Sequence, residues 1–332
     1  MKVLSIIIPA YNVEKYLADA MAPYLALEEA EKLEVLIIND GSKDHTLQKA
    51  KEYAERYPEV IKVIDKENGG HGSAINAGIL HAEGKYFKVV DGDDWVDEEV
   101  LAEFLKRLEY LEVDMVASGF TIVYEETGQK EEVHIQNVEF GKQYQFPKVC
   151  ENIGHIGMHS IIYKTEILKE NGLCLDEHCF YVDVEYNLFP LKRVDTVVFF
   201  DELLYQYRIG RPGQSVNMKS MIKNRENHER VIRRIMDWIK TEELSEPVKS
   251  YAEKRLAAMA DIQYLILFDM GTGKKEREEL KKYDMWLKNE NRKIYDSITQ
   301  RKVLLMRKRN FKNYYLVKFL YKLSGGKIEY IK

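Results

Sequence analysis

Four short apolar runs, separated by segments of helical periodicity, constrain the fold of the first ninety residues. Each run has the length of a buried strand and is followed by polar or glycine residues. The runs are Val3–Ile8, Val35–Ile38, Val60–Ile64 and Tyr86–Val90. Alternation of strands and helices predicts an α/β fold with a mostly parallel sheet covered on both faces. Because such sheets bind ligands beyond the carboxyl ends of their strands, functional residues are expected there.

The segments between the runs have the apolar spacing of helices. One helical face is shared by Tyr16, Leu17, Ala20, Met21, Tyr24 and Leu25. Further helices are expected from an N-cap at Asp44 through Arg56, over 71–82, and from Asp97 onward.

The pattern changes twice further along the chain. Between about residues 113 and 207, strands mix with loops, and after Val216 the sequence is almost wholly helical and strongly charged. The expected strands are Met115–Ala117, Thr121–Tyr124, Ser160–Tyr163 and Thr196–Phe200.

The bulk composition excludes several classes of protein. A net charge of -5 gives no reason to expect nucleic acid as a partner, and the three cysteines have no metal-type spacing. The first apolar run is too short for a signal peptide, and no window approaches the roughly 18 apolar residues of a membrane span. We therefore expect a cytoplasmic protein. From Arg301 to Lys332, however, ten Lys and Arg residues accompany one acidic residue, Glu329.

The first two strand ends carry Pro9, Tyr11, Asn12 and Asp40. Tyr11 can offer a flat ring to a nucleobase, a contact worth roughly 1–3 kcal/mol in nucleic-acid complexes. A tyrosine that packs its own loop is the alternative. Asp40 can accept a hydrogen bond from a base N–H, or it can cap the next helix.

The third strand leads into a glycine-rich turn that includes Asn68, Gly70 and His71. Three glycines in residues 69–72 allow close backbone approach to a ligand, and the helix start that follows favours phosphate. The turn lacks the Gly-Lys-Ser/Thr ending of a P-loop, and it does not follow the first strand as a dinucleotide fingerprint would. A plain glycine turn is the competing interpretation.

The fourth strand ends in Asp91, Gly92, Asp93 and Asp94. Three carboxylates around one glycine repel one another unless a cation is present. Mg²⁺ and Mn²⁺ prefer hard oxygen ligands, and Mg²⁺ is usually held by one or two carboxylates together with substrate phosphates. The alternative is an acidic turn that caps the next helix, but Asp97 already serves that purpose.

In this order and spacing, the four strand ends resemble those of the family 2 glycosyltransferases of GT-A fold. The motifs are Ile-Pro-Ala-Tyr-Asn, Asn-Asp-Gly-Ser-Lys-Asp, Glu-Asn-Gly-Gly, and Ala-Glu-Gly-Lys-Tyr with Asp-Gly-Asp-Asp-Trp. The resemblance is close over about the first hundred residues and looser to about Val216. It implies a GT-A domain over 1–215, with a nucleotide-binding half (about 1–112) and an acceptor-binding half (113–215), followed by a helical extension over 216–332.

The resemblance also implies roles for particular residues. The first-strand loop and Asp40 would hold the nucleoside, commonly uridine. The Asp-x-Asp motif corresponds to Asp91-Gly92-Asp93, with Asp91 near the ribose and both carboxylates at a Mn²⁺ or Mg²⁺ site. The donor set expected from the motifs is Pro9, Tyr11, Asn12, Asp40, Asn68, Gly70, Asp91, Gly92 and Arg208.

The resemblance places the general base in Phe180-Tyr181-Val182-Asp183-Val184-Glu185, with Asp183 as the candidate and Glu185 in reserve. Residues 207–215 resemble the loop that closes over the donor, where Arg208 or Arg211 would approach the diphosphate. Many members carry Arg-Asn where this chain has Ile75-Asn76. His71 either compensates for that arginine or is structural.

The resemblance implies a transferase that moves a sugar from a nucleotide-diphosphate donor to a hydroxyl acceptor with inversion. A UDP-sugar is the expected donor. A glycan or lipid-linked acceptor in surface polysaccharide synthesis is expected, with His155 and His159 either lining its side of the cleft or serving as ordinary loop residues. The basic, aromatic tail either contacts the inner face of the membrane or packs on the catalytic domain. The rival functions are a non-catalytic sugar-nucleotide or glycan-binding module and a sugar nucleotidyltransferase.

Overall fold

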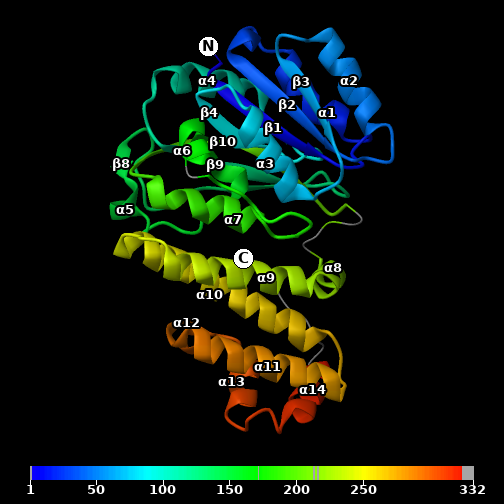
Figure 1. Cartoon of the computed structure of the whole chain (residues 1–332), viewed down its shortest axis with the longest axis vertical. Coiled ribbons are helices and arrows are strands. Elements are labelled where there is room, and N and C mark those ends of the chain that lie inside the picture. Colours follow the sequence, from blue (N-terminus) through cyan, green and yellow to red (C-terminus); the bar gives the residue numbers. More distant parts are fainter. Residues whose placement is uncertain (1, 171, 212–213, 215–216, 324–332) are drawn as a thin grey trace. The chain divides into compact units, whose positions relative to one another are not determined.

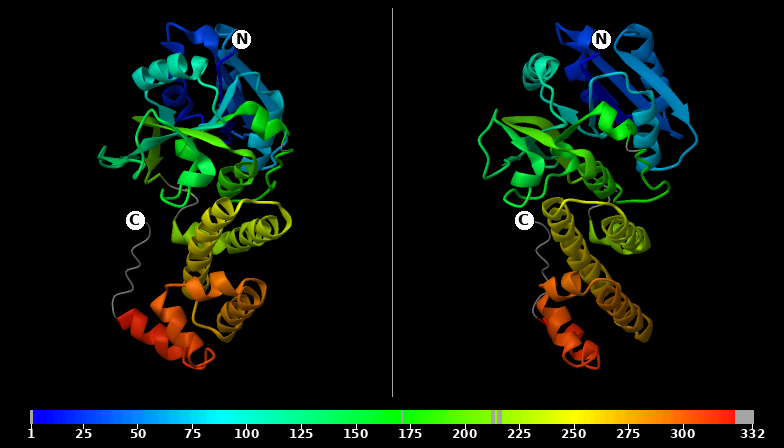
Figure 2. Two further views of the ribbon diagram at one scale, coloured as in Figure 1. Left: turned by 90° about the vertical axis from the view of Figure 1, so that its left-hand side faces the viewer. Right: turned by 60° about the vertical axis from the view of Figure 1, so that its left-hand side comes forward.

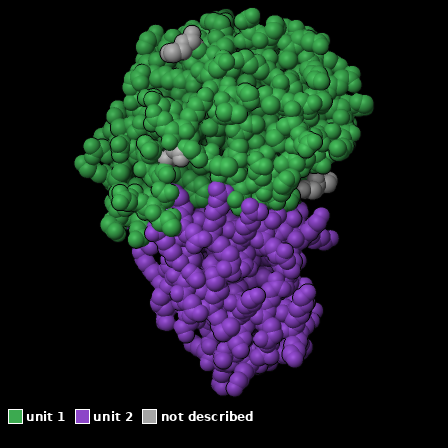
Figure 3. All heavy atoms as spheres, viewed as in Figure 1, with its two compact units in different colours: residues 1–214, 241–249 green, residues 215–240, 250–332 purple. Residues whose placement is uncertain are grey.

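The computed structural model describes residues 2–170, 172–211, 214 and 217–323. The chain divides into two compact units, one formed by residues 1–214 and 241–249 and the other by 215–240 and 250–332 (Figure 3). Part of the 207–215 loop and the last nine residues of the basic tail lie outside the described residues.

The first unit is built on a ten-stranded mixed sheet, as far as its residues are described (Figure 1). The main strand order is β3-β2-β1-β4-β9-β6-β10-β5, and β7 and β8 pair with β6 and β10. The strands are β1 (Leu4–Ala10), β2 (Leu33–Asp40), β3 (Ile61–Lys66), β4 (Tyr86–Val89), β5 (Trp95–Val96), β6 (Met115–Tyr124), β7 (Lys130–Val133), β8 (Gln143–Gln145), β9 (Ile161–Lys164) and β10 (Thr196–Ile209).

The parallel part of the sheet agrees with the expected α/β fold. β1 pairs in parallel with β2 and β4, β2 with β3, and β6 with β10, whereas β9 is antiparallel to both of its neighbours. Two expectations need correction. Met115–Ala117 and Thr121–Tyr124 are one continuous strand, and the expected strand at Thr196–Phe200 continues to Ile209 through an irregularity in register after Phe200.

Helices cover both faces of this sheet (Figure 1, Figure 2). Ile6 and Ile8 of β1 belong to a core shared with α1 and α4, whereas Ile7 points to the other face and contacts Gly78 of α3. A side chain at Gly78 would clash with Ile7, so glycine allows close packing there. The helices of this unit are α1 (Leu17–Leu25), η1 (Ala30–Lys32), α2 (Thr46–Arg56), α3 (His71–His81), α4 (Glu98–Tyr110), α5 (Phe146–Val149), η2 (Met158–Ser160), α6 (Thr165–Glu170), α7 (Asp183–Leu188) and η3 (Phe189–Arg193).

Two helix starts test the expected caps. Asp97 caps α4 by accepting a hydrogen bond from the Val100 N–H at 3.1 Å. Asp44 lies one residue before the N-cap position of α2, which is occupied by His45, although its carboxylate still accepts from the Thr46 N–H.

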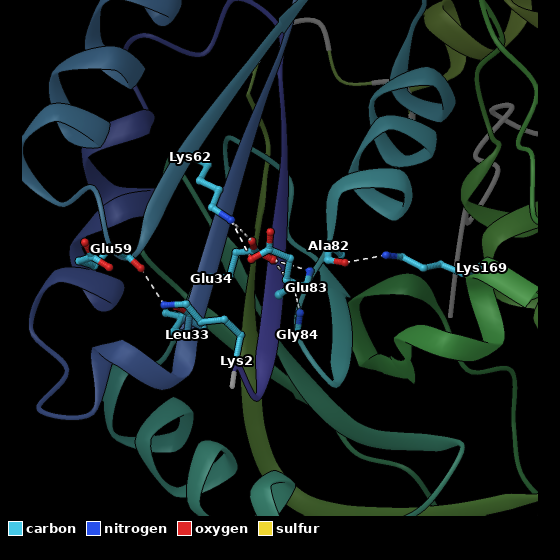
Figure 4. Close-up of polar contacts among 10 residues, drawn as sticks. Lys2, Leu33, Glu34, Glu59, Lys62, Ala82, Glu83, Gly84 and Lys169 are labelled. Carbon is cyan, nitrogen blue, oxygen red and sulfur yellow. Dashed lines mark hydrogen bonds and ion pairs between the residues drawn. The ribbon is translucent and has the colours of Figure 1, made fainter.

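A buried carboxylate connects the strands near their amino ends, away from the carboxyl ends that carry the candidate site residues (Figure 4). Glu34 of β2 accepts from the Ser5 hydroxyl at 2.6 Å, the Glu83 N–H at 2.9 Å and the Lys62 ammonium at 2.9 Å. Ser5 in turn accepts from the Gly84 N–H. The network joins β1, β2 and β3 to the turn that begins β4.

The second unit is helical. Its segments include α8 (Met218–Lys223), α9 (Arg225–Thr241), α10 (Glu246–Asp269), α11 (Lys274–Glu290), α12 (Arg292–Ser297), α13 (Arg301–Arg307) and α14 (Tyr314–Leu323). Arg307 donates to Asp284 of α11 and to the Tyr264 hydroxyl of α10, and so joins three helices. Among the described residues, no helix combines the length and the apolarity needed to cross a bilayer.

Candidate active site

The ends of β1, β2 and β4 lie next to one another because these strands are neighbours in the parallel part of the sheet. The loop after β1 is fastened to the turn after β2. Asn12 donates its N–H to Ser42 Oγ at 3.1 Å and accepts from the Lys43 N–H at 2.7 Å. Asn12 has a φ of 55°, a left-handed conformation that asparagine tolerates. Tyr11 is about half exposed (49%), so its ring is accessible beside the strand end rather than packed into the loop.

Asp40 at the end of β2 organises the glycine-rich turn. Its carboxylate accepts from the N–H groups of Gly69 and Gly70 at 2.8 and 2.7 Å, and from the Asn68 amide at 3.0 Å. The Lys66 ammonium pairs with it at 3.0 Å. Asp40 therefore does not cap α2. The N–H groups of Gly69 and Gly70 therefore donate to a carboxylate of the protein.

The acidic turn after β4 gathers three carboxylates. One oxygen each from Asp91, Asp93 and Asp94 lies within 4.8 Å of the others, a spacing that can hold a metal ion. Gly92 brings this turn against β1, because a Cβ there would lie 2.9 Å from the Pro9 carbonyl oxygen. Since Asp97 caps α4, the acidic turn has no capping role.

The three carboxylates have different partners. Asp94 is buried and accepts from the Tyr205 hydroxyl at 2.6 Å and from the Arg208 N–H at 2.8 Å. Burial and the charges of Asp93 and Asp91 raise the pKa of Asp94 well above its usual range. Tyr205 also accepts from the Asp91 N–H at 3.1 Å. β10 thus supports the acidic turn, a contact that no sequence motif indicated.

Asp93 and Asp91 face charged groups. Asp93 forms an ion pair with Arg211, and burial together with the Asp91 charge raises the pKa of Asp93 to about 6. Asp91 lies 2.8 Å from His71 Nε2. Burial opposes ionisation of both partners of this pair, but their mutual attraction outweighs it, so the pKa of His71 is raised and that of Asp91 is lowered.

The two arginines of the 207–215 segment differ in their surroundings. Arg208 lies between the rings of Tyr16 and Trp95, donates to the Asp93 carbonyl oxygen at 3.0 Å and pairs with Asp19 at 2.8 Å. Arg211 directs its guanidinium to the Asp93 carboxylate. Arg208 therefore braces the backbone of the acidic turn, while Arg211 reaches its side chains.

The segment that carries Asp183 is attached to the start of α3. The His178 N–H donates to the Gly69 carbonyl oxygen at 2.5 Å, and Asn76 of α3 exchanges two hydrogen bonds with the backbone of Leu175. Asp183 itself begins α7, is partly exposed, and contributes to the raised pKa values of His71 and Tyr207. The glycine-rich turn and the segment that carries the candidate base are thus brought together.

Glu185, the reserve base, is in a different environment. It is fully buried and accepts from the Asp176 N–H at 2.9 Å. It therefore holds the backbone of the segment that leads to Asp183. Two residues of this segment, His178 and Tyr181, have φ values of 50° and 69°. A bulky residue in this conformation is an outlier, and such strain clusters at functional sites.

The two histidines of the 155–159 segment have different environments. The ring of His159 packs on Phe120, Tyr205 and Tyr207 with centroid distances of 5.1, 4.9 and 4.3 Å, and burial lowers the pKa of His159 to about 4. His155 is exposed and lines a pocket of about 310 Å³ together with Phe120, His134, Gln136, Asn137 and Gly154. Phe120 borders both the ring cluster and the pocket.

A mostly parallel sheet with a cluster of three carboxylates in the turn after β4 is the arrangement expected of a GT-A fold. The sequence profile described as glycosyl transferase family 2 matches residues 5–172, which is about half of the chain. The chain belongs to glycosyltransferase family 2.

Relatives and solved structures agree with this assignment. The chain is 30% identical over 213 residues to the uncharacterized glycosyltransferase EpsJ of Bacillus subtilis, a match that covers 62% of this chain and 60% of EpsJ. It is 29% identical over 275 residues to the minor teichoic acid biosynthesis protein GgaB of the same organism, which covers 80% of this chain but only 28% of GgaB. The crystal structure of S. aureus TarS 1-349 in complex with UDP-GlcNAc has the same fold, with a TM-score of 0.67, 20% identity, and coverage of 100% of this chain and 94% of TarS 1-349.

Proposed function

We propose that this glycosyltransferase moves a sugar from a nucleotide-diphosphate donor, with UDP as the nucleotide, to a hydroxyl group with inversion at the anomeric carbon. The observation that carries the proposal is the position of Asp183, attached through residues 175–178 to the same glycine turn that borders the acidic turn. Donor-side carboxylates and a candidate base on the acceptor side are what a direct displacement requires.

The donor nucleotide would lie along the ends of β1, β2 and β4. Pro9, Tyr11 and Asn12 form the accessible loop after β1, and Asp40 contributes by holding Asn68 and Gly70 in place. Asp91 and Gly92 would face the ribose and the diphosphate. Arg211 is the better placed of the two arginines to approach a phosphate, whereas Arg208 would act by holding the Asp93 backbone.

Asp91 and Asp93 fit a divalent cation, and Asp94 completes the set of nearby oxygens. The fit is supported by the raised pKa of Asp93, which reflects burial and repulsion by Asp91 that a cation would relieve. When bound, Mn²⁺ or Mg²⁺ would neutralise charge on the departing diphosphate. The protein's own part is to hold the acidic turn in place, through Gly92, the Tyr205 hydroxyl that accepts from the Asp91 N–H, and the Arg208 N–H that donates to Asp94.

Asp183 would take the proton from the acceptor hydroxyl. A general base contributes typically 10²–10⁴-fold to the rate. Its partial exposure leaves it accessible, whereas the buried Glu185 is engaged with Asp176. A direct displacement by the acceptor oxygen needs no second carboxylate as nucleophile.

The acceptor is proposed to be a glycan or a lipid-linked glycan of a surface polysaccharide, with the reaction at the inner face of the membrane. Support comes from the similarity to GgaB, a minor teichoic acid biosynthesis protein. The pocket at Phe120 and His155 offers an aromatic ring with polar side chains beside it, which suits a sugar unit of such an acceptor.

Thermal unfolding with a panel of nucleoside diphosphates, with and without Mn²⁺, tests the donor site. A ligand that binds only the native state adds about 2.7 kcal/mol at a hundredfold excess over its dissociation constant. We expect a Mn²⁺-dependent shift with UDP that is lost in Asp93→Ala and kept in Glu98→Ala, an exposed carboxylate in the first turn of α4. A shift with another nucleotide alone would refute the choice of UDP. No shift with any nucleotide would favour a glycan-binding module without transfer activity.

A further inference from the structure

The last described helix carries its apolar face on the outside. Leu316, Phe319, Leu320 and Leu323 of α14 recur at the spacing of one helical face, and each is between 53% and 68% exposed. In a helix of a soluble protein, a stripe with this spacing normally faces the core. Here the stripe is directed to solvent.

The contacts of the opposite face fix this orientation. The Tyr314 hydroxyl donates to the Gly271 carbonyl oxygen at 2.9 Å, and Lys318 is buried and donates to the Phe268 carbonyl oxygen. The ring of Tyr321 packs edge-on against Phe268 with a centroid distance of 5.3 Å. Tyrosine and lysine therefore attach α14 to α10 and the turn after it, and the leucine and phenylalanine side chains cannot also face inward.

The neighbouring helix, α13, also exposes apolar side chains. In α13, Val303 and Met306 are buried, while Leu304 and Leu305 are exposed. Among the described residues, seven of the thirteen exposed large apolar side chains lie in 304–323. We call these seven the apolar surface: Leu304, Leu305, Tyr315, Leu316, Phe319, Leu320 and Leu323.

The charge around the apolar surface has one sign. Residues 301–323 contain eight Lys and Arg and no Asp or Glu. Arg301, Lys308, Arg309, Lys312 and Lys322 are exposed. A second copy of the chain docked face to face would bring these like charges together without compensation. An anionic lipid surface instead offers complementary phosphates around an apolar interior.

We propose that α13 and α14 bind the surface of a membrane that contains anionic phospholipid, with the apolar surface at the boundary of the acyl chains and the basic side chains among the headgroups. Interfacial helices of this composition lie in the membrane plane and do not span it. The inference deepens the proposed site of reaction at the membrane, but it rests on the second unit and needs no step of catalysis.

Flotation of the full chain with lipid vesicles tests the inference. Vesicles of phosphatidylcholine alone are compared with vesicles that also contain phosphatidylglycerol, at low and high salt. We expect binding to the anionic vesicles that weakens with salt, because screening reduces the attraction of exposed charges. The double variant Phe319→Glu with Leu320→Glu should bind at least tenfold more weakly. The matched control is Leu80→Glu with Tyr110→Glu, two exposed apolar side chains of the first unit, and should bind as the parent does.

A second variant distinguishes the contribution of the basic side chains from that of the apolar surface. Lys308→Glu with Arg309→Glu leaves the apolar surface intact and should also lose binding to anionic vesicles. Circular dichroism confirms that each variant is folded, and the nucleotide-induced thermal shift is measured in parallel, so failure of the donor site is distinguished from failure of membrane binding. The proposal is overturned if the parent does not float with anionic vesicles. It is equally overturned if light scattering shows a dimer that the Phe319 and Leu320 variant abolishes, since a second copy would then be the occupant.

Discussion

Three chemically identical side chains have three different environments in the acidic turn. Asp91 faces His71, Asp93 faces Arg211, and Asp94 directs both oxygens to β10. The difference arises from position: Asp94 is the last of the three along the chain and meets Tyr205 and the Arg208 N–H of β10. Asp94 is therefore a positioning residue, and Asp91 and Asp93 are the carboxylates turned toward the proposed donor.

The base assignment gives the first prediction at this scale. Asp183→Asn should lower the transfer rate by about 10²–10⁴-fold, because the amide cannot accept the acceptor's proton. The nucleotide-induced thermal shift should persist, since the donor carboxylates are unchanged. Single-turnover transfer and thermal unfolding measure the two effects.

Glu177→Gln is the matched control, because Glu177 is an exposed carboxylate six positions earlier in the same segment. It should retain activity. If Asp183→Asn transfers sugar at the rate of the parent, Asp183 is not the base.

Glu34 gives a second prediction, on stability. Burial alone would raise the pKa of Glu34, but the hydrogen bonds of Ser5 and the Glu83 N–H, together with Lys62, lower it below 4.5. A carboxyl group whose pKa is lowered on folding stabilises the protein above its ordinary pKa, and this contribution is lost as the pH falls through the folded value. Glu34→Gln should therefore lower the free energy of unfolding by about 1–3 kcal/mol at neutral pH.

Denaturant unfolding over a pH series measures this effect. The difference between Glu34→Gln and the parent should shrink below pH 4.5, the ordinary value for the group. Glu83→Gln removes an exposed partner of the same lysine and should change stability by less than about 1 kcal/mol. A constant difference across the pH series would contradict the ionic role of Glu34.

At the scale of elements, α3 links the proposed donor side to the candidate base, Asp183. Its first turn follows the glycine turn held by Asp40, and its body holds Leu175 through Asn76. Gly72 is where the Asp176 backbone crosses α3, and a Cβ there would clash with the Asp176 carbonyl oxygen. The absence of a side chain is thus what allows the segment of Asp183 to approach the donor turn.

Gly72→Ala should push this segment away from α3. Overpacking costs typically about 1–3 kcal/mol in stability, and a displacement of about 1 Å at a reacting group can reduce the rate about 10²-fold. Gly157→Ala, where the nearest atom to an added Cβ would be His159 Nδ1 at 3.9 Å, is the control for added volume. Thermal unfolding and transfer kinetics should separate the two variants, and equal behaviour would show that the crossing tolerates a methyl group.

The elements themselves show what a sequence can predict. The four apolar runs predicted the parallel strands to within two residues at each end, and Val35–Ile38 is extended at both ends to Leu33–Asp40. Local periodicity carries that information. The Tyr205–Asp94 contact joins residues 111 positions apart, and the packing of Arg208 on Tyr16 and Trp95 is similarly distant, so neither leaves a local pattern. The burial of Glu34 within an apolar strand also leaves no local pattern, because its partners come from other parts of the chain.

The basic tail shows even more clearly that a local pattern does not predict contacts between distant residues. Its composition indicated either lipid contact or packing of an aromatic face, and periodicity alone would place Leu316, Phe319, Leu320 and Leu323 inward. In the structure the inward contacts come from Tyr314, Lys318 and Tyr321. Which face is buried depends on what the neighbouring helices offer, and Phe268 offers both a ring and a carbonyl oxygen.

At the scale of the whole molecule, the two units have separate sources of stability. The first has the sheet with its buried strands. The second has its own buried apolar side chains, among them Ile232, Leu256 and Leu280. Polar contacts between its helices include those of Arg307, which donates to Asp284 at 2.6 Å, to the Tyr264 hydroxyl at 2.9 Å and to the Tyr295 carbonyl oxygen at 2.8 Å. Arg307 and Asp284 are both nearly buried, so neither charge has water as a substitute partner.

Arg307→Met should therefore destabilise the second unit by about 3–5 kcal/mol, because it leaves Asp284 as a buried charge without its partner in this pair. Arg292→Met, which breaks an exposed pair with Asp296 one helical turn away, should cost less than about 1 kcal/mol. Calorimetry of both variants, with and without UDP and Mn²⁺, measures whether the loss of stability is confined to the second unit. The residues of the proposed donor site belong to the first unit, so Arg307→Met should keep the nucleotide-induced shift, while membrane flotation should weaken as α13 loosens. A shift that disappears together with flotation would mean that the two units unfold as one, and stability of the helical unit would then be a condition for donor binding.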